Sequence, residues 1–381
     1  MRSLNDQAAI VGIGQTEFSK ESGRSELQLA AEAAHAAIVD AGLEPADIDG
    51  MVTFTMDTSD ELLLMRALGI PEVRYWSRTP FGGAGANTTV LNAASAVASG
   101  AARNVLIWRA FNERSGNRFG QPHQGPPPTG RSWYIPFGLD TPAKIYSLTF
   151  QRYMDEYGLT NEDFGRYSVV ARKHAATNPA AWFYERPITL EDHQNSRWIV
   201  EPILRLLDCC QESDGGVAMV VTSSEHARDL RQKPARIASV VDSHLMNGHV
   251  LFNYYLEDQT QFAECISAAA RIWETTGLRP SDMDAAMIYE NFSPIVFMQL
   301  EGFGFCGLGE ARDFIADGHI ELGGQIPVNT HGGLLGEAYI HGVNNILEAV
   351  RQIRGTAVNQ VPDAEHVLVA GGRGGIVLGQ G

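Results

Sequence analysis

Short apolar runs alternate with longer alanine-rich stretches along the chain, and this alternation predicts strands that alternate with helices. The first apolar run, residues 8–14, is bounded by glycine and fits a buried strand. Residues 25–41 then repeat apolar positions at helical spacing, and Gly42 is suited to end that helix. Strands that alternate with helices favour mostly parallel sheets covered by helices.

One segment of this pattern occurs twice. Residues 42–52 and 277–287 match at the Gly, Leu and Pro positions and at both Asp positions, with a constant offset of 235 (277 minus 42). In both places an alanine-rich helical pattern precedes the segment and a short apolar run follows it. The repeat predicts that the chain is built from two related halves.

Glycine-rich turns extend the repeat. The turn at 81–85 opens an alanine-rich helix that leads to the apolar run 104–108. The turn at 331–336 opens another helix, which leads to the run 366–370. Two such halves predict a duplicated α/β fold in which two related sheets pack together.

A different kind of sequence separates the halves. It contains a Pro/Gly-rich loop at 120–128, and amphipathic patterns predict helices at 142–157 and 161–176. Long insertions of this kind usually carry substrate contacts. The resulting division is an N-terminal half at 1–113, an inserted loop and helical subdomain at 114–205, the end of the N-terminal half at 206–245, and a C-terminal half at 246–381.

Charge and hydropathy narrow the class of partner. The chain of 381 residues has 29 basic and 45 acidic side chains, a formal net charge of −16, which disfavours nucleic acid as a partner. No apolar run reaches the roughly 18 residues that span a membrane. Residues 1–7 are polar and lack the apolar core of a signal peptide. We therefore expect a soluble, cytoplasmic protein.

Two further residue types carry candidate chemistry. Five arginines in one stretch could form a basic patch for an anionic cofactor or could be scattered over the surface: Arg103, Arg109, Arg114, Arg118 and Arg131. The four cysteines show no CxxC spacing and suggest neither a zinc site nor a disulfide framework: Cys209, Cys210, Cys265 and Cys306.

The order of four further segments makes a family recognisable. These segments are 208–218, 303–306, 327–333 and the terminal glycine loop 371–375. With the duplicated halves, they resemble the thiolase superfamily nearly end to end, and specifically its sterol-carrier-protein-type and nonspecific lipid-transfer-protein branch. The resemblance implies two mixed β-sheets with sandwiched helices in a layered α-β-α-β-α arrangement, and a homodimer.

The chain departs from that family at the reacting groups. A thiolase forms an acyl-enzyme on a cysteine in the turn that opens the first-half helix, but here the turn at 83–87 has none. The second cysteine, expected near 369–373, is also missing, and Cys209, Cys210 and Cys306 lie in segments that are structural in thiolases. Tyr339 and Tyr289 stand where the two site histidines are expected. Without a nucleophile no acyl-enzyme can form, so Claisen chemistry is not expected.

Missing cysteines combined with tyrosines for histidines resemble the steroid side-chain aldolases of the same superfamily. This resemblance implies retro-aldol cleavage of a β-hydroxyacyl-CoA to a ketone, the steroid nucleus, and a shorter acyl-CoA such as propionyl-CoA. It implies no cofactor, because the substrate is itself a CoA thioester. It also implies a small zinc-ribbon/OB-fold partner protein that is linked to a hydratase.

The chemistry of that cleavage assigns roles to candidate residues. An acid/base group and an oxyanion hole suffice, and a phenol with a pKa of about 10 needs help from its neighbours to serve as a base. We hypothesise that Tyr289 and Tyr339 are the acid/base pair, with the direction of proton transfer left open, although either could be an ordinary buried aromatic residue. Supporting positions are Glu290, Asn291, His331 and His341, which could equally have structural roles, and Gly372 and Gly374 are candidate backbone oxyanion donors.

Other mechanisms and other functions remain as alternatives. A Schiff-base aldolase needs a lysine, and none of the four lysines lies in a matched motif: Lys20, Lys144, Lys173 and Lys233. His331 and His341 flank Tyr339, but no acidic spacing completes a metal site, so no metal is expected. The first alternative function is an inactive thiolase homologue that binds acyl-CoA or lipid for transfer or as a scaffold. The second is a residual thiolase that uses an unrecognised cysteine.

Overall fold

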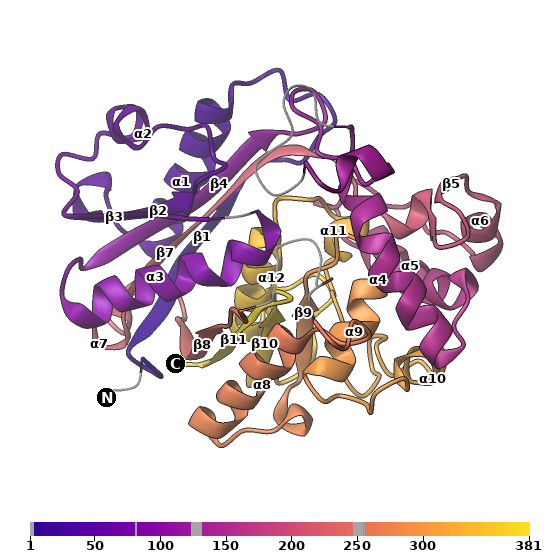
Figure 1. The fold of residues 1–381 in the computed structure, drawn as a ribbon. Helices are drawn as coiled ribbons and strands as arrows, with labels where there is room; N and C mark the ends of the chain where they lie inside the picture. Colours follow the sequence, from indigo (N-terminus) through magenta and orange to yellow (C-terminus); the bar gives the residue numbers. More distant parts are fainter. Residues whose placement is uncertain (1–3, 81, 123–131, 247–253, 255) are drawn as a thin grey trace.

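A computed structural model describes residues 4–80, 82–122, 132–246, 254 and 256–381 (Figure 1). Its strands are β1 (Ala8–Gln15), β2 (Gly50–Phe54), β3 (Tyr75–Thr79), β4 (Asn104–Asn112), β5 (Trp198–Val200), β6 (Leu204–Arg205), β7 (Asp214–Ser223), β8 (Ala235–Asp242), β9 (Ala285–Ile288), β10 (His366–Ala370) and β11 (Gly374–Gln380). Its α-helices are α1 (Glu26–Ala41), α2 (Glu61–Leu68), α3 (Ala86–Ser99), α4 (Pro142–Tyr157), α5 (Asn161–Ala176), α6 (Leu190–Asn195), α7 (Ser224–Ala227), α8 (Ala263–Thr276), α9 (Pro294–Gly302), α10 (Ala311–Ala316), α11 (Gly333–Gly336) and α12 (Val343–Arg354).

The large sheet is mixed and joins the two halves. Its nine strands run in the order β3-β2-β4-β7-β1-β8-β11-β10-β9. The first five strands belong to the first half, and β1 meets β8 of the second group through only two residue pairs, Ala9 with Arg236 and Ile10 with Ala235. The mixed α/β class expected from the sequence is confirmed, and the two expected sheets join edge to edge at this short ladder.

The central layer consists of α3 and α12, which pack in one core cluster with strands from both halves. Side chains of a strand alternate between its two faces, so β4 sends Val105 and Ile107 into this central cluster. Leu106 and Trp108 point the other way and pack with α1. Residues of α8 cover the outer face of the second half. The layers therefore follow the expected α-β-α-β-α arrangement.

The sequence repeat is also a repeat of hydrogen bonds. Gly42 and Gly277 end α1 and α8 with left-handed φ values of 76° and 73°. After each of them a short 3-10 turn leads to a strand, β2 or β9. Asp49 then accepts backbone N–H bonds from residues 103 and 104 at 2.8 and 2.9 Å. Asp284 accepts from residues 365 and 366 at the same distances. Each carboxylate thus fixes the start of the neighbouring parallel strand.

Replacing either aspartate should destabilise its half. We expect Asp284→Ala and Asp49→Ala each to lower the free energy of unfolding by about 1–3 kcal/mol, because two backbone N–H groups, one of them partly buried, lose their acceptor. Asp284→Asn, which keeps an acceptor oxygen, should lose less. Denaturant unfolding measures the change, with Asp317→Ala as an exposed control. Equal stability of Asp284→Ala and the control would contradict the assignment.

The segment between the halves forms the two expected helices with the expected bounds, α4 and α5. Phe150 of α4 and Phe164 of α5 are buried in the same cluster as Phe297 of α9, so these helices pack on the second half (Figure 1). Of the Pro/Gly-rich loop at 120–128, positions 123–128 lie outside the described residues. No helix in the described part is both long enough and apolar enough to cross a membrane.

One predicted helix begins later than expected. The turn at 331–336 forms only the single-turn α11, and the long helix α12 starts at Val343. Left-handed φ values at His341 (51°) and Gly342 (76°) lie between α11 and α12 and interrupt the helix. The chain between α11 and α12 is therefore an irregular buried segment, and it carries Tyr339.

Candidate active site

The two candidate tyrosines lie together. Tyr289 follows β9, and Tyr339 lies between α11 and α12. Their hydroxyl oxygens are 2.8 Å apart, although the residues are 50 positions apart in the chain. Each tyrosine is only 7% exposed. A buried pair of hydrogen-bonded phenols can pass a proton from one hydroxyl oxygen to the other, and water has little access to them.

Tyr289 is fixed at both its backbone and its ring. Its N–H donates to the carbonyl of Ala370 at 2.8 Å, and its carbonyl accepts from Gln299 Nε2 at 2.7 Å. A Cβ at Gly83 would lie 2.1 Å from the phenol oxygen, and one at Gly342 would lie 2.8 Å from the ring. The turn that lacks the cysteine is therefore the wall against which this phenol packs, and a side chain at position 83 would compete with Tyr289 for the same space.

Tyr339 is held by its neighbouring backbone. Its N–H donates to Ser213 Oγ at 3.2 Å, and Glu212 pairs with it in an isolated bridge. The ring of His341 meets the Tyr339 ring edge to face, with centroids 5.2 Å apart. These contacts hold the Tyr339 phenol next to Tyr289, although the segment between α11 and α12 is irregular.

Burial controls the electrostatics of the pair. It raises the pKa of Tyr289 and of Tyr339 well above the ordinary value, because the charged phenolate would lose its water. A negative charge on Cys210 or on Glu113 would raise both pKa values further. Both phenols are thus uncharged near neutral pH, and they can donate or relay a proton.

The two residues that follow Tyr289 serve different contacts. Glu290 is fully buried and accepts the backbone N–H of Leu334 at 2.7 Å, so its carboxylate holds α11. Burial raises its pKa to about 8. The carbonyl of Asn291 accepts from the Cys210 N–H, while its side-chain oxygen is buried without a partner among the described residues. Glu290 Oε2 likewise has no hydrogen-bond partner among the described residues, so each of the two residues keeps one buried acceptor oxygen for a new polar contact.

His341 is neutral and oriented by a buried ion pair. Its Nδ1 accepts from Arg109 Nε at 3.0 Å, and Arg109 Nη1 lies 2.9 Å from Asp57 Oδ2. Burial and the charge of Arg109 hold the pKa of His341 well below its usual value. Arg109 therefore does not belong to a surface basic patch, because it is buried and already paired. Arg131, another member of that candidate patch, lies outside the described residues.

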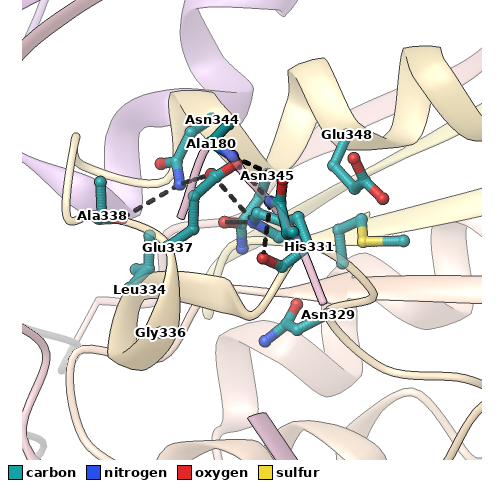
Figure 2. Close-up of polar contacts among 12 residues, drawn as sticks. Ala180, Asn329, His331, Leu334, Gly336, Glu337, Ala338, Asn344, Asn345 and Glu348 are labelled. Atoms are coloured by element: carbon teal, nitrogen blue, oxygen red, sulfur yellow. Dashed lines mark hydrogen bonds and ion pairs between the residues drawn. The ribbon is translucent and has the colours of Figure 1, made fainter. Parts of the chain in front are cut away.

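His331 belongs to a buried polar network with Glu337, Asn344 and Asn345 (Figure 2). Its Nε2 lies 3.2 Å from Asn345 Oδ1 and 3.7 Å from Glu337 Oε2, and burial lowers its pKa to about 4. Asn344 Nδ2 donates to Glu337 Oε2 at 2.9 Å and to the Ala338 carbonyl at 3.0 Å. Burial raises the pKa of Glu337 to about 7. This network holds the two residues that precede Tyr339.

The terminal glycines are already engaged. The N–H of Gly372 donates to Gln299 Oε1 at 2.8 Å, so it is not free to bind an oxyanion in this structure. Gly374 begins β11, and its carbonyl accepts from Gly371. Gln299 bridges this loop to the carbonyl of Tyr289, a connection that sequence reasoning missed.

Three residues near the tyrosines were not selected from the sequence. Glu113, Cys210 and Lys20 interact electrostatically with one another or with the phenols. Lys20 Nζ donates to Gln211 Oε1 at 2.8 Å, and burial lowers the pKa of its amine to about 8. No motif marks Glu113 or Lys20, and Cys210 lies in the family segment 208–218 without having been linked to the tyrosines, because these residues come near the tyrosines only through the fold.

The cysteines show no activated thiol. Burial raises the pKa of Cys210 well above its usual value, and it also raises the pKa values of Cys209, Cys265 and Cys306. Because the thiolate is the nucleophile, these thiols are poorly reactive near neutral pH, which weighs against a residual thiolase. In the part of the chain that the structure describes, no three His, Cys, Asp or Glu residues gather in a way that could hold a metal ion.

Comparison with known proteins places this site in a family. Residues 253–380 match the family model described as Thiolase C-terminal domain-like. The chain is 57% identical over 389 aligned residues to a steroid side-chain-cleaving aldolase of Thermomonospora curvata, covering 100% of this chain and 99% of the relative. It is 53% identical to the 17-hydroxy-3-oxo-4-pregnene-20-carboxyl-CoA lyase of Mycobacterium tuberculosis, covering 99% of this chain and 100% of that protein.

A solved structure agrees with these relatives. A chain described as an Ltp2-ChsH2(DUF35) aldolase superposes with a TM-score of 0.94 at 56% identity, covering 99% of this chain and 98% of that one. This chain is similar to known aldolases over nearly its whole length. It also has the duplicated α/β fold, the turn without cysteine and the buried pair of phenols. The chain therefore belongs to the thiolase superfamily, and within it to the group of steroid side-chain-cleaving aldolases.

Proposed function

We propose that this protein is a carbon–carbon lyase that cleaves the side chain of a β-hydroxyacyl-CoA steroid by retro-aldol chemistry. The products are a ketone and a shorter acyl-CoA such as propionyl-CoA. The observation that carries this proposal is the buried pair of phenols, whose oxygens lie 2.8 Å apart. The names of relatives that are 57% and 53% identical support the substrate class.

The reaction needs only proton transfer and charge stabilisation. The β-hydroxyl proton moves to the phenol pair as the Cα–Cβ bond breaks, and the bond electrons form the thioester enolate. The pair then returns a proton to the enolate carbon. No covalent intermediate is required, so the absence of a cysteine from the turn at 83–87 does not hinder the cycle. Only the Nδ2 amide group of Asn291 could donate to the thioester oxygen, because its unpartnered Oδ1 is an acceptor.

A second protein component is part of the proposal. The solved relative is described as an Ltp2-ChsH2(DUF35) aldolase, and that description names a DUF35 component beside the aldolase. We infer that this chain works with a small zinc-ribbon/OB-fold protein of that kind, which is in turn linked to a hydratase. The hydratase link is chemically reasonable, because hydration of an unsaturated acyl-CoA yields a β-hydroxyacyl-CoA.

The experiment that tests the function uses the chain with and without such a partner. A β-hydroxyacyl-CoA steroid of the class named for the Mycobacterium tuberculosis relative is incubated with the protein, and mass spectrometry follows the ketone and the short acyl-CoA. We expect both products in equal amounts, with faster formation when the partner is present. Tight binding of the ester without cleavage under either condition would favour the inactive homologue that binds acyl-CoA or lipid.

A homodimer is also proposed, through the edge of the sheet. β3 is the outermost strand on the first-half side, and Trp76 on it is 62% exposed. Leu62 and Leu63 of the adjoining α2 are exposed as well. An exposed apolar edge strand is a common site for association with another chain. The occupant we infer is the same strand of a second copy.

Charging this edge should separate the subunits. We expect Trp76→Glu to shift the protein from dimer to monomer, because the charge would lose its water inside an apolar interface. Light scattering after size-exclusion chromatography measures the mass. Val358→Glu, which changes an exposed apolar residue of the second half, is the matched control. A monomeric wild type, or a Trp76→Glu variant that remains dimeric, would contradict this proposal.

A further inference from the structure

Retro-aldol cleavage leaves negative charge on the thioester oxygen of the substrate, and this oxygen needs hydrogen-bond donors. The sequence suggested the backbone of the terminal glycine loop for this task. The N–H of Gly372 is already committed, because it donates to Gln299 Oε1 at 2.8 Å. Another element of the structure must therefore supply a donor, and a suitable one lies beside Tyr339.

The tautomer of His341 is fixed by a buried ion pair from the first half. Arg109 carries only donors, so His341 Nδ1 must accept its Nε–H at 3.0 Å, and the ring hydrogen of the neutral imidazole is then on Nε2. Asp57 Oδ2 holds Arg109 in place, because it accepts from Arg109 Nη1 at 2.9 Å and from the Ala110 N–H at 3.1 Å. Arg109 and Asp57 are 1% and 3% exposed, so water does not compete for these bonds.

Aromatic contacts and the backbone fix the orientation of the same ring. Phe119 stacks on the imidazole with ring centroids 5.3 Å apart, the Phe111 centroid lies 5.0 Å away, and Tyr339 meets the ring edge to face. His341 has a left-handed φ of 51°, a conformation that is strained in a residue other than glycine and that persists where surrounding contacts impose it. The ring is therefore held rigidly, as a preorganised donor must be.

The Nε2 atom of His341 faces the turn that also borders the phenol of Tyr289. A Cβ at Gly82 would lie 2.8 Å from His341 Nε2, and a Cβ at Gly83 would lie 2.1 Å from the Tyr289 hydroxyl oxygen. Because Gly82 and Gly83 are consecutive, the two polar atoms lie against neighbouring points of one turn. Among the described residues Nε2 has no hydrogen-bond acceptor, although His341 is only 3% exposed. An unpaired donor on a buried side chain is costly unless a ligand supplies its acceptor.

We propose that His341 is a catalytic residue that donates a hydrogen bond from Nε2–H to the thioester oxygen of the substrate, and that Arg109 is its positioning residue. As the Cα–Cβ bond breaks, its electrons delocalise onto this oxygen, and the hydrogen bond becomes stronger. The Nε2 proton stays on the imidazole throughout, because the phenols carry out the proton transfers. An oxyanion accepts more than one hydrogen bond, so this role adds to that of the Asn291 amide.

This inference rests on the proposed lyase function, and the chemistry of a neutral imidazole supports it. Burial and the charge of Arg109 hold the pKa of His341 well below its usual value, so the ring is uncharged near neutral pH. A neutral imidazole can donate from Nε2 without first taking up a proton and without giving one to the enolate oxygen. Its donor is therefore present at every stage of the reaction.

The first test compares His341→Leu, His341→Gln and the wild type as complexes with the partner protein. We expect His341→Leu to lower kcat about 100- to 1000-fold with little change in KM, because the lost hydrogen bond is strongest in the transition state. Glutamine carries an amide N–H group that can take the place of Nε2–H, so His341→Gln should recover part of the rate.

The control for this test is a histidine away from the site. His174 of α5 is also buried, its Nδ1 lies 3.1 Å from the Val328 carbonyl, and burial lowers its pKa to about 4. His174→Leu should therefore keep the wild-type kcat. Thermal unfolding of each variant separates a loss of chemistry from a loss of folding.

A spectroscopic test addresses the role of Arg109. Nitrogen-15 NMR of histidine-labelled protein distinguishes protonated from unprotonated ring nitrogens, and the His341 signals are those missing from His341→Gln. We expect hydrogen on Nε2 in the wild type. Arg109→Met combined with Asp57→Asn removes both charges of the pair together, so the hydrogen should exchange between the two ring nitrogens and kcat should fall about 10-fold or more. A bound steroid acyl-CoA that lacks the β-hydroxyl group should shift the wild-type Nε2–H signal.

The outcomes separate this inference from the lyase function. A wild type whose Nε2–H signal responds to the bound acyl-CoA but which cleaves no β-hydroxyacyl-CoA overturns the lyase function and supports the contact. Cleavage by the wild type together with an equal kcat for His341→Leu overturns only the role of His341. Hydrogen on Nδ1 in the wild type, or an Nε2–H signal that does not respond to the bound ester, has the same consequence even if no variant folds.

Discussion

Tyr339→Phe is expected to lower turnover by about 10²–10⁴-fold, because it removes the hydroxyl that completes the proton path. Tyr289→Phe should have a similar effect. The two changes together should cost little more than either alone, since both break one hydrogen-bonded pair whose oxygens lie 2.8 Å apart. Formation of the short acyl-CoA under single-turnover conditions measures the chemical step.

The matched control for this loss is a tyrosine away from the site. Tyr157, at the end of α4, has a hydroxyl 3.5 Å from Thr260 Oγ1, and Tyr157→Phe should keep wild-type turnover. Thermal unfolding of all variants separates loss of chemistry from loss of folding. Turnover of Tyr339→Phe at the wild-type rate would remove the phenol pair from the mechanism and leave the fold assignment intact.

Local sequence patterns were sufficient to predict much of the fold. The spacing of apolar residues predicted α4 and α5 with their observed bounds, and the Gly-Leu-Pro-Asp repeat located β2 and β9. These features depend on helical periodicity, on a glycine cap and on an aspartate that accepts hydrogen bonds from the backbone N–H groups of a neighbouring strand. Each is a short-range or repeated signal that one sequence can carry.

The pairing of Tyr289 with Tyr339 came from the resemblance to a family, because both tyrosines replace expected site histidines. The structure brings the two hydroxyls together, but the roles of the residues around them stay predictions. What the sequence could not indicate is how distant residues meet. His341 is kept neutral by its burial and by Arg109, 232 positions away, and Ser213 Oγ accepts from the backbone N–H of Tyr339, 126 positions away. The interruption between α11 and α12 was missed for a related reason, since nothing in the sequence marks the left-handed conformation of His341, and a glycine such as Gly342 also occurs in helix-opening turns.

Gly83→Ala should disable the enzyme although it substitutes neither tyrosine. The added methyl would lie 2.1 Å from the Tyr289 hydroxyl, so either the ring or the turn must move. Overpacking of this kind lowers stability by about 1–3 kcal/mol. Displacing the Tyr289 ring would separate the two hydroxyls, and we expect turnover to fall toward that of Tyr289→Phe. Denaturant unfolding and the acyl-CoA assay measure the two effects.

A double-mutant cycle identifies the cause. In a Tyr289→Ala background the methyl has room, so the stability lost through Gly83→Ala should largely disappear. In a Tyr339→Phe background the Tyr289 ring is still present, and the loss should remain. Equal losses in both backgrounds would mean that the turn itself, and not the phenol, rejects the methyl. If the cycle behaves as expected, Gly83→Cys would not restore thiolase chemistry, because its sulfur would need the volume that the phenol fills. The Tyr289 phenol then fills the space that a cysteine at position 83 would need. The missing nucleophile and the added phenol are therefore two sides of one change at this turn.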